Sequence, residues 1–396
     1  MRPTRTQIGV GGLTLDERAK SLVMEVLDSN RLTAGPKMER FERELAAIHD
    51  RRFGLMCNSG TSALQIALAA LKEVHGWADG DEVLVPAVTF VATSNVIMYN
   101  GLRPVFVDVE PDHYMLDPAK IEARITPRTR AIVPVHIGGS PCDMQPILEI
   151  AARHSLKIVE DSCETMFARY RGRPVGSFGD IGCFSTYVAH VVITGVGGVC
   201  VTSDPDLIVI LKSLMNHGLD SIYIRIDDDQ NKRDIFEIAD RRFSFVRLGH
   251  SFRCTEMEAA LGLAELERRE ASLMRRRAIA ARLSGGLSDL EEHLQLPSIR
   301  AQSDHVFMFY PLKLRHGPRD ELIRHLEEHA IETRYLLPLI NQPIYRKLFG
   351  NLDAEYPVAA DLNRSAFYIG CHPGISDGEV DYVIEAFHQF FGANKQ

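Results

Sequence analysis

Six short apolar runs within the first 202 residues constrain the fold of this chain more than any other feature. They are rich in Val and Ile, and Gly, Pro, Asp or Ser residues bound each one. They occupy residues 82–85, 104–109, 131–135, 158–160, 182–185 and 198–202. Strands that are apolar along their whole length are typical of a sheet covered on both faces. The pattern therefore predicts an α/β sandwich built on a largely parallel sheet.

Helical patterns lie between these runs, and the layout changes after them. Helices are expected to begin at Gly35-Pro36 and to cover 61–71, and a long helix is expected over 259–277. The remainder indicates a strand near 305–314 and helices over 319–329 and 377–391. We therefore expect a large domain over 1–275 and a small α+β domain over 276–396. The most polar stretch, 227–240, is expected to be an exposed loop.

Composition excludes several classes of protein. Hydrophobic residues make up 45% and charged residues 25%, as in ordinary globular proteins, and the net charge is −8. An acidic chain is a poor candidate for binding nucleic acid or an anionic membrane surface. No apolar run reaches the roughly 18–20 residues that span a bilayer. The seven cysteines form no CxxC pair, so we expect no metal site and a reducing, cytoplasmic location.

One glycine turn leads directly into a predicted helix. In Asn58-Ser59-Gly60-Thr61-Ser62-Ala63 the turn carries hydroxyl side chains and precedes an apolar segment. The N–H groups of a helix N-terminus suit a phosphate. A simple Ser/Thr helix cap explains the same residues. The segment alone leaves both interpretations open.

Acidic and aromatic residues follow two of the predicted strands. Glu160 and Asp161 end one apolar run and Glu164 follows, at the edge where open α/β sheets bind ligands. Alternatively, Asp161 caps a helix. Phe90 follows another run, where its ring could stack on a planar ligand or belong to the core.

A third segment combines glycine turns, hydroxyl groups and a histidine. Ser185 ends a predicted strand, His190 follows five residues later, and Gly195 to Gly198 lead into the next strand. A lone histidine is more often structural than catalytic, and the glycines are most simply a turn. Neither feature identifies a function by itself.

Taken together and in this order, these segments resemble the DegT/DnrJ/EryC1/StrS family of sugar aminotransferases, which use pyridoxal phosphate. The resemblance extends from about Gly35 to Val383. The segments that carry it are Gly35-Pro36, Ser59-Gly-Thr-Ser-Ala-Leu64, Pro86-Ala-Val-Thr-Phe90, Pro104-Val-Phe-Val-Asp-Val109, Pro134-Val-His-Ile-Gly-Gly139, Glu160-Asp161, Val175-Gly-Ser-Phe-Gly-Asp-Ile-Gly-Cys-Phe-Ser185, Thr255-Glu-Met-Glu-Ala-Ala-Leu-Gly-Leu-Ala264 and His372-Pro373-Gly374.

The resemblance implies a fold-type-I, aspartate-aminotransferase-like subunit whose large domain binds the cofactor. It also implies a homodimer with active sites at the subunit interface. The residues that should bind the cofactor phosphate are Gly60, Thr61 and Ser185. Phe90 should stack on the pyridine ring and Asp161 should bind the ring nitrogen, which keeps the ring protonated as an electron sink. Glu164 belongs to the same implied site.

Two positions depart from the family pattern. The family carries a Schiff-base lysine five residues after the serine, where this chain has His190, and no lysine lies between Lys157 and Lys212. The cofactor should therefore be bound without a covalent link. The family usually has Asn at Ser251, where it reaches the partner subunit's phosphate, so this contact is in doubt.

A histidine at the lysine position is characteristic of one branch, the 3-dehydratases of nucleotide-linked 4-keto-6-deoxyhexoses, which use pyridoxamine phosphate. The leading hypothesis is such a dehydratase, with His190 as catalytic residue, a nucleotide-linked keto sugar as substrate and glutamate as amino donor. A sugar aminotransferase without the lysine and a non-catalytic or regulatory relative remain alternatives. An engineered replacement of the lysine also fits. Cysteines are too few after residue 200 for the iron–sulfur cluster of one subgroup, so none is expected.

Overall fold

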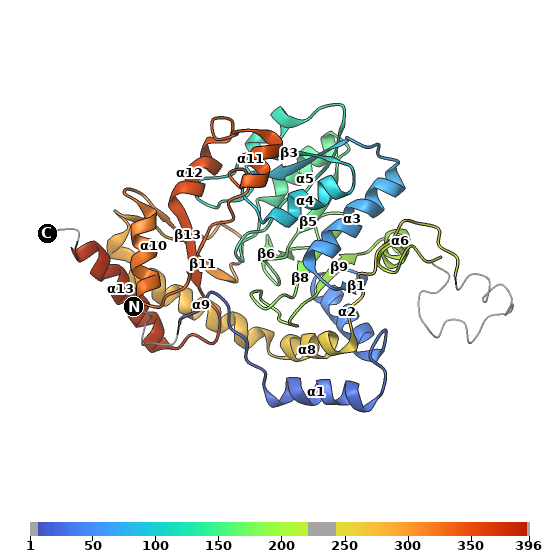
Figure 1. Ribbon diagram of the computed structural model, residues 1–396, viewed down its shortest axis with the longest axis horizontal. Helices are drawn as coiled ribbons and strands as arrows, with labels where there is room; N and C mark the ends of the chain where they lie inside the picture. The colour runs from blue at the N-terminus through green and yellow to red at the C-terminus, as the bar shows by residue number, and fades with distance from the viewer. Residues whose placement is uncertain (1–6, 221–242, 394–396) are drawn as a thin grey trace.

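A seven-stranded sheet lies at the centre of the computed structural model, which describes residues 7–220 and 243–393 (Figure 1). Its strands are β1 (Phe53–Cys57), β2 (Glu82–Pro86), β3 (Arg103–Val107), β4 (Thr129–Ile132), β5 (Lys157–Asp161), β8 (Ile181–Ser185) and β9 (Gly198–Thr202). They lie in the order β1-β9-β8-β5-β4-β2-β3. The strands from β8 to β3 are parallel, whereas β9 is antiparallel to both β8 and β1. The predicted, largely parallel α/β sheet is confirmed.

Helices cover both faces of this sheet. Every residue of β2, β8 and β9 is buried, and successive side chains of a strand point to opposite faces. Complete burial therefore requires a covering layer on each side. The helices of this region are α1 (Glu17–Asp28), α2 (Pro36–Ile48), α3 (Gly60–His75), α4 (Val91–Tyr99), α5 (Met144–Arg153) and α6 (Pro205–Met215).

Two of these helices begin where the sequence predicts, for reasons visible in their caps. The helix expected over 61–71 begins at Gly60, where the Ser59 hydroxyl accepts a hydrogen bond from the N–H of Ser62 at 3.0 Å. The helix expected at Gly35-Pro36 is α2, which has no cap from its own N-cap side chain. The buried carboxylate of Glu256 instead accepts hydrogen bonds at 2.9 Å from three N–H groups at its start, those of Gly35, Lys37 and Met38.

The prediction of one long helix over 259–277 is wrong. The structure has two helices there, α8 (Glu256–Glu267) and α9 (Arg269–Gly286). Arg268 lies between them with φ −104° and ψ 6°, outside the helical region. Its guanidinium donates to the carbonyl oxygen of Thr14 at 2.9 Å and to Asp16 at 3.2 Å, just before α1. The helix is therefore interrupted at Arg268, at the end of α8, the helix that packs against α1.

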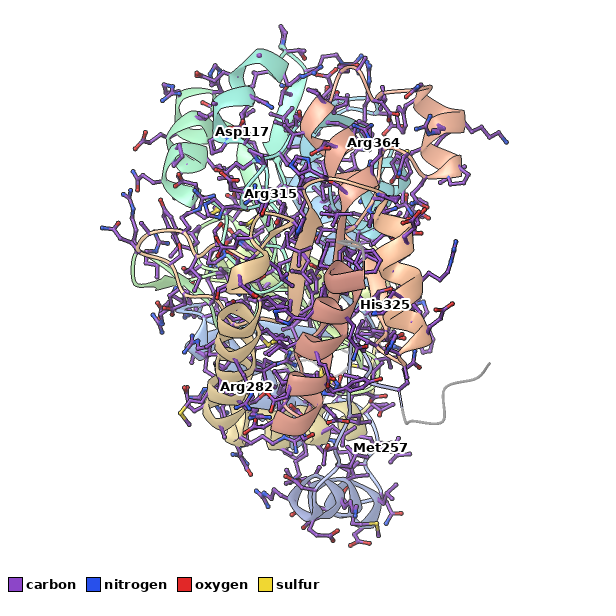
Figure 2. The ribbon with its side chains drawn as sticks, turned by 90° about the vertical axis from the view of Figure 1, so that its left-hand side faces the viewer. Asp117, Met257, Arg282, Arg315, His325 and Arg364 are labelled. Atoms are coloured by element: carbon purple, nitrogen blue, oxygen red, sulfur yellow. The ribbon has the colours of Figure 1, made fainter. Side chains whose placement is uncertain are left out.

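A four-stranded antiparallel sheet organises the C-terminal part. Its strands are β10 (Leu294–Gln295), β11 (Phe309–Leu314), β12 (Thr333–Tyr335) and β13 (Ala366–Gly370), in the order β10-β11-β13-β12. Its helices are α10 (Arg319–Glu328), α11 (Pro343–Phe349), α12 (Pro357–Ser365) and α13 (Asp377–Ala393). Figure 2 shows α9, α13 and α10 side by side, and Arg282 of α9 forms an ion pair with Asp381 of α13 at 2.7 Å. Smaller elements are the hairpin of β6 (Arg169–Tyr170) and β7 (Arg173–Pro174) and the 3-10 turns Pro118–Lys120, Glu122–Arg124 and Ser288–Leu290.

One strand of this part is shorter than the sequence predicts. The strand expected over 305–314 begins only at Phe309. Phe307 has a positive φ of 48°, and a β-strand cannot continue through a residue in that conformation. The expected α+β character of this region is nevertheless confirmed.

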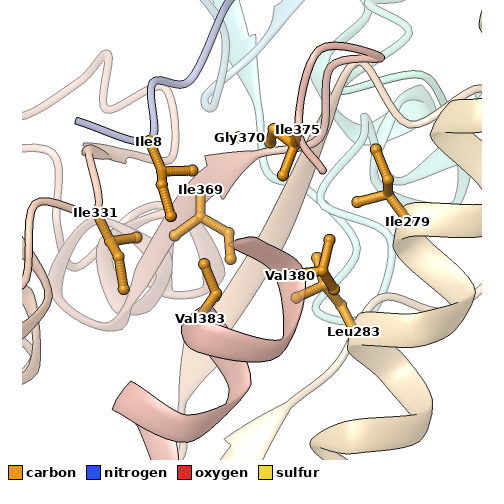
Figure 3. A pocket seen from close by; sticks show the side chains of 9 residues that line it. All are labelled: Ile8, Ile279, Leu283, Ile331, Ile369, Gly370, Ile375, Val380 and Val383. Carbon is orange, nitrogen blue, oxygen red and sulfur yellow. The ribbon is translucent and has the colours of Figure 1, made fainter. Parts of the chain in front are cut away.

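Two apolar cores follow the two sheets, but they share segments of the chain. Ile8 packs into the core of the small sheet, whereas Tyr345 and Leu362 pack into the core of the large one. The domain boundary between 275 and 276 stays a prediction. A small apolar pocket in the second core is shown in Figure 3, and its lining contains no candidate site residue. It is lined by Ile8, Ile279, Leu283, Ile331, Ile369, Gly370, Ile375, Val380 and Val383.

None of the helices within residues 7–220 and 243–393 is both long and apolar enough to cross a lipid bilayer. In the same residues, no group of three or more His, Cys, Asp or Glu side chains is arranged to hold a metal ion. The polar stretch expected at 227–240 lies outside the described residues.

Candidate active site

The candidate site lies at the carboxyl edge of the large sheet. Asp161 ends β5 and Ser185 ends β8, and these two parallel neighbours bring both residues to the same edge. Gly60 begins α3 beside them. A Cβ atom on Gly60 would come within 2.8 Å of both the Cys163 sulfur and the Ser185 Cβ, so only glycine fits. The structure thus brings Gly60 and Ser185 together, as predicted.

The first turn of α3 is capped, and the cap leaves some of its N–H groups without an acceptor in the helix. Ser59 caps the N–H of Ser62, which confirms the structural interpretation. A helix nevertheless begins with four N–H groups that have no acceptor within the helix, and its N-terminus is positive. Gly60 and Thr61 carry the first of these groups, beside the Ser185 side chain. The cap therefore does not exclude anion binding.

Asp161 is buried and fixed by two donors. The Thr93 hydroxyl donates to its Oδ2 at 2.7 Å, and the Cys163 N–H donates to its Oδ1 at 3.1 Å. Burial raises the pKa of Asp161, and these hydrogen bonds only partly offset that effect. No helix begins in the described residues 162–204, so Asp161 does not cap one. A buried carboxylate held this way is ready to pair with a cationic group.

Phe90 lies at the start of α4, the helix whose Thr93 binds Asp161. The N–H of Thr93 donates to the Phe90 carbonyl oxygen at 3.2 Å, so the two residues lie on one face of the helix. Phe90 is 60% exposed, whereas Thr93 is buried. The core interpretation of Phe90 is therefore wrong. An exposed aromatic ring beside a buried carboxylate is suitably placed to stack on a planar ligand.

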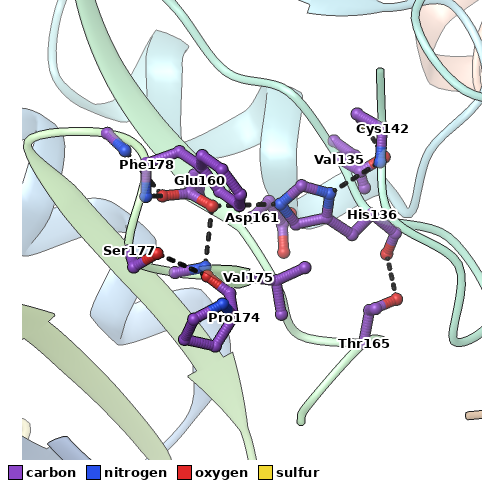
Figure 4. Close-up of polar contacts among 12 residues, drawn as sticks. Val135, His136, Cys142, Glu160, Asp161, Thr165, Pro174, Val175, Ser177 and Phe178 are labelled. Atoms are coloured by element: carbon purple, nitrogen blue, oxygen red, sulfur yellow. Dashed lines mark hydrogen bonds and ion pairs between the residues drawn. The ribbon is translucent and has the colours of Figure 1, made fainter. Parts of the chain in front are cut away.

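Glu160, next to Asp161, has a different role, which Figure 4 shows. Its carboxylate accepts hydrogen bonds from three backbone N–H groups at 2.6–2.7 Å, those of Gly176, Phe178 and Gly179. The fourth donor is His136, whose Nδ1 accepts from the Cys142 N–H, so the proton lies on Nε2, 3.2 Å from Glu160. Glu160 is fully buried and fixes the turn that leads into β8.

The charge state of Glu160 follows from these partners. Burial alone would raise its pKa, but hydrogen bonds from His136 and Gly179 and the charge of Arg51 hold the pKa of Glu160 below its ordinary value. The guanidinium of Arg51 lies 3.9 Å from the carboxylate. Glu160 is therefore an ionised structural residue.

The pKa of Glu164 is shifted in the opposite direction from that of Glu160. Burial, with a further contribution from Asp161, raises the pKa of Glu164 to about 8, although the N–H of Gly138 donates to its Oε2 at 3.1 Å. At neutral pH this side chain carries a proton and can donate a hydrogen bond. The three acids of this segment thus differ. Glu160 is ionised and structural, Asp161 is a buried acid with a raised pKa, and Glu164 is neutral at pH 7.

His190 lies in a turn that follows Ser185. Its N–H donates to the Tyr187 carbonyl oxygen at 2.9 Å, and the N–H of Tyr187 lies 3.4 Å from the Ser185 hydroxyl. Among the described residues, the buried Nδ1 of His190 has no hydrogen-bond partner. Burial lowers the pKa of His190 to about 4, so the imidazole is neutral at pH 7. A neutral imidazole can accept a proton at its unprotonated ring nitrogen.

The remaining glycines behave as predicted. Gly195 and Gly197 have positive φ angles of 89° and 148° and form the turn that leads into β9. A Cβ atom on Gly197 would lie only 2.4 Å from the Thr186 hydroxyl. This turn holds the His190 loop against the strand that precedes it.

Ser251 lies on a separate segment of the chain, which follows the residues left undescribed at 221–242. It is exposed, and its hydroxyl accepts a hydrogen bond from Arg253 at 3.2 Å. The adjacent Phe252 carbonyl oxygen accepts from the Asn58 N–H at 2.7 Å. The segment around Ser251 therefore lies beside the turn that precedes α3. Its role toward a ligand stays a prediction.

Most of the described lysines pair with carboxylates. Six of them form ion pairs with carboxylates, and these are Lys20, Lys37, Lys72, Lys120, Lys157 and Lys313. Lys157 begins β5, the strand that Asp161 ends, so it lies at the opposite edge of the sheet, about 13 Å away along the strand. His190 therefore has no neighbouring lysine on its own loop or strand.

Sequence reasoning missed two residues of this site. Thr93 could have been found, because it lies one helical turn after Phe90 and carries a hydroxyl group. Arg276, whose guanidinium donates to the His190 carbonyl oxygen at 3.3 Å, gave no such signal. It belongs to a run of three arginines, and such runs are usually solvated.

The comparisons with known proteins agree with this geometry. Residues 13–388 match the model of the DegT/DnrJ/EryC1/StrS aminotransferase family. The GDP-perosamine synthase of Caulobacter vibrioides is 34% identical over 388 residues, covering 97% of this chain and 98% of the relative. A dTDP-4-dehydro-2,6-dideoxy-D-glucose 3-dehydratase of Saccharopolyspora spinosa is 34% identical over 407 residues, covering 97% and 87%.

A solved structure extends the likeness to the fold. A mutant of GDP-4-keto-6-deoxymannose-3-dehydratase with bound GDP-perosamine matches with a TM-score of 0.86 and 25% identity, covering 96% of this chain and 99% of that one. The overall fold of this chain is thus shared with that structure. The chain belongs to the DegT/DnrJ/EryC1/StrS aminotransferase family.

Proposed function

We propose that this protein is a C-3 dehydratase of a nucleotide-linked 4-keto-6-deoxyhexose that works with pyridoxamine phosphate. The observation that carries the proposal is His190 at the family's lysine position, on a stretch of sequence with no lysine between Lys157 and Lys212. The matched relatives include both a synthase of an amino sugar and a 3-dehydratase, so the family alone does not decide between the two reactions.

The residues of the site fit this cofactor. A Cβ at Gly60 would fill the space between α3 and Ser185, so the glycine keeps a cradle open at a positive helix end, where a phosphate is stabilised. Phe90 offers an exposed ring for the pyridine. Asp161 offers a buried carboxylate to the ring nitrogen, and Glu164 is a neutral acid that can donate to an oxygen of the ring. Thr61 adds a hydroxyl group beside the cradle.

The bound cofactor would supply an amino group and a protonated ring that stabilises a carbanion. Asp161 would hold the proton on the ring nitrogen, and Thr93 would hold Asp161. The neutral imidazole of His190 would take up a proton at its unprotonated ring nitrogen and then give it to the departing 3-hydroxyl group as general acid. Because an imidazole forms no stable imine, His190 would leave the cofactor non-covalently bound.

The amino donor follows from the electron balance. Replacing a hydroxyl group by hydrogen consumes two electrons and two protons and releases water. Glutamate would supply both electrons by its oxidation to 2-oxoglutarate, and its nitrogen would leave as ammonia. An aminotransferase would instead retain the nitrogen in the sugar.

We also infer a homodimer. Among the described residues, several large apolar side chains near the Ser251 segment are exposed, Leu248 at 98% and Phe243 at 85%. Exposed side chains of this size are typical of a surface that a partner covers. A second copy of the chain would bury them and bring the Ser251 segment next to the partner's site. A catalytically competent monomer would contradict this inference.

The experiment is product analysis. The enzyme is incubated with glutamate and a panel of nucleotide-linked 4-keto-6-deoxy sugars, and mass spectrometry is combined with assays of ammonia and 2-oxoglutarate. The proposal predicts loss of the 3-oxygen and one ammonia per 2-oxoglutarate. An amino sugar with no ammonia would establish the aminotransferase alternative. No turnover on any sugar, with cofactor bound, would favour a non-catalytic relative.

A further inference from the structure

Arg276 of α9 is a buried cation with an unusual set of partners. Its side chain is 2% exposed. One guanidinium nitrogen, Nη1, donates to the carbonyl oxygens of Phe307, Met308 and Cys371 at 3.2, 2.9 and 3.2 Å. The other, Nη2, donates to the carbonyl oxygen of His190 at 3.3 Å. All four acceptors are therefore backbone groups.

These acceptors join three separate parts of the molecule. His190 belongs to the loop after β8 of the large sheet, Phe307 and Met308 precede β11, and Cys371 follows β13 of the small sheet. Within the described residues, no carboxylate lies within 4 Å of Arg276. A buried charge without an ionic partner is costly, and such charges are rarely kept without a function. Its Nε is also buried without a partner in that part of the chain.

We propose that Arg276 is a positioning residue for His190: it fixes the backbone of the His190 turn against the small sheet and so sets where the imidazole points. The inference rests on the proposed function, in which His190 moves the proton. Two hydrogen bonds then hold residue 190, its own N–H to Tyr187 and its carbonyl oxygen to Arg276. A proton-transferring group must be held within a fraction of an ångström of its productive position.

The charge of Arg276 also favours the neutral form of His190. After burial, Arg276 is the group that lowers the pKa of His190, so the cation keeps the imidazole neutral and able to accept a proton. The other titratable groups near Arg276 are His372, after β13, whose pKa burial and Arg276 also lower, and Cys371 and Glu265, both of which raise the pKa of Arg276. The segment that packs over the loop, Gly11 against Ala189 and Gly12 against His372, carries no charge.

If Arg276 had a purely structural role, substitutions at this position would have different effects. Arg277 provides a matched control. Arg277 is the next residue of α9, and its Nε donates to the carbonyl oxygen of His305 at 3.1 Å. It therefore also binds a carbonyl oxygen just before β11, but it does not bind residue 190. Arg277→Gln tests what the loss of such a contact costs when the His190 turn is left intact.

The experiment compares Arg276→Gln, Arg276→Lys, Arg277→Gln, His190→Asn and the double variant with both Arg276→Gln and His190→Asn, all with bound cofactor. For Arg276→Gln we expect kcat to fall about 100-fold with little change in KM, the loss expected when a reacting group is misplaced. The acidic limb of its kcat profile should move to higher pH, because the imidazole protonates more easily. Arg276→Lys keeps the charge but not the fork, so kcat should fall about tenfold and the limb should stay.

The double variant separates this inference from the proposed function. If Arg276 acts through His190, adding Arg276→Gln to His190→Asn causes no further loss. Independent, multiplying losses would overturn the positioning role while leaving the proposed function intact. Near-normal turnover of His190→Asn would instead overturn the proposed function. Full activity of Arg276→Lys would also overturn the inference. So would an Arg277→Gln variant that loses as much activity as Arg276→Gln. If Arg276→Gln does not fold, Arg276→Lys still tests the inference.

Discussion

The hydroxyl group of Thr93 donates a hydrogen bond to Asp161, with 2.7 Å between Oγ1 and Oδ2. This bond joins α4 to the carboxyl end of β5 inside the protein. A second hydroxyl, that of Thr89, lies 2.8 Å from Thr93 Oγ1 and completes a short chain of hydroxyl groups that ends at the carboxylate. The orientation of Asp161 is therefore set by residues that precede and follow Phe90.

Thr93→Val removes this donor without changing the size of the side chain. A hydrogen bond to a charged group contributes about 1.5–3 kcal/mol, so we expect kcat to fall roughly ten- to a hundred-fold. Thr89→Val, which removes only the outer hydroxyl group, is the control and should lose much less. Asp161→Ala should abolish turnover while phosphate binding weakens only modestly, as measured by cofactor titration. Equal losses in both threonine variants would contradict this prediction.

His190→Asn should keep cofactor binding but lower the rate of dehydration about 10²–10⁴-fold, the usual range for general acid–base catalysis. His190→Lys should restore a covalent link to pyridoxal phosphate and favour transamination. Borohydride reduction followed by peptide mass spectrometry checks this, because the wild-type protein should yield no adduct at the site and the lysine variant should yield one. An adduct on any lysine of the wild-type pocket would disprove non-covalent binding.

Gly60→Ala should weaken cofactor binding by a purely steric effect. Its Cβ would lie 2.8 Å from both the Cys163 sulfur and the Ser185 Cβ, so the start of α3 must move away from β8. We expect the Kd for pyridoxamine phosphate to rise about tenfold or more, measured by isothermal titration. Gly285→Ala in α9 is the control, since a Cβ there meets nothing within 4 Å and should leave binding unchanged.

Glu160→Gln should destabilise the fold, because one carboxylate oxygen becomes an NH2 group facing donors. Leaving buried groups unsatisfied in this way costs about 1–3 kcal/mol, or more for a charged network. Urea unfolding should show a lower midpoint with an unchanged m-value. Glu149→Gln is the control: Glu149 is exposed and accepts a hydrogen bond from Gln145 of the same helix, so the midpoint of this variant should not move.

Stability should fall when the pH drops from about 7 to 4. Burial lowers the pKa of His49 to about 4, that of His190 to about 4 and that of His305 to about 3. Between these values and the ordinary pKa near 6.5, the unfolded chain binds more protons than the folded one, so acid favours unfolding. His49→Asn should weaken the pH dependence of the urea midpoint between pH 6.5 and 4.5. An unchanged slope would contradict the prediction.

The strands and the glycine turn before α3 could be predicted because local sequence determines them. The runs at 182–185 and 198–202 are apolar along their length, and such runs form buried strands wherever they lie. Gly60 could be predicted for the same reason, because the glycine turn and the apolar helix after it are adjacent in sequence. In the fold, its lack of a side chain is required by Ser185, which lies 125 residues later.

What could not be predicted depends on contacts between distant segments. Glu160 and Asp161 look equivalent in the sequence, and only the N–H groups of Gly176, Phe178 and Gly179 make Glu160 structural. The long helix over 259–277 has a continuous pattern, but Arg268 leaves the helical conformation to bind residues before α1. Arg276 is one of three consecutive arginines, and only its burial against four carbonyl oxygens distinguishes it.

The order of strands in the large sheet has a consequence for how the protein is made. β1 lies at the edge and pairs only with β9, in a register that places Phe53 opposite Thr202. At about 5–20 residues per second, a ribosome needs roughly 7–30 s to add the residues between them. During that time the first strand of the nascent chain waits with its hydrogen-bonding edge unpaired. Such an edge is open to pairing with other chains, so this interval is when a chaperone would matter most.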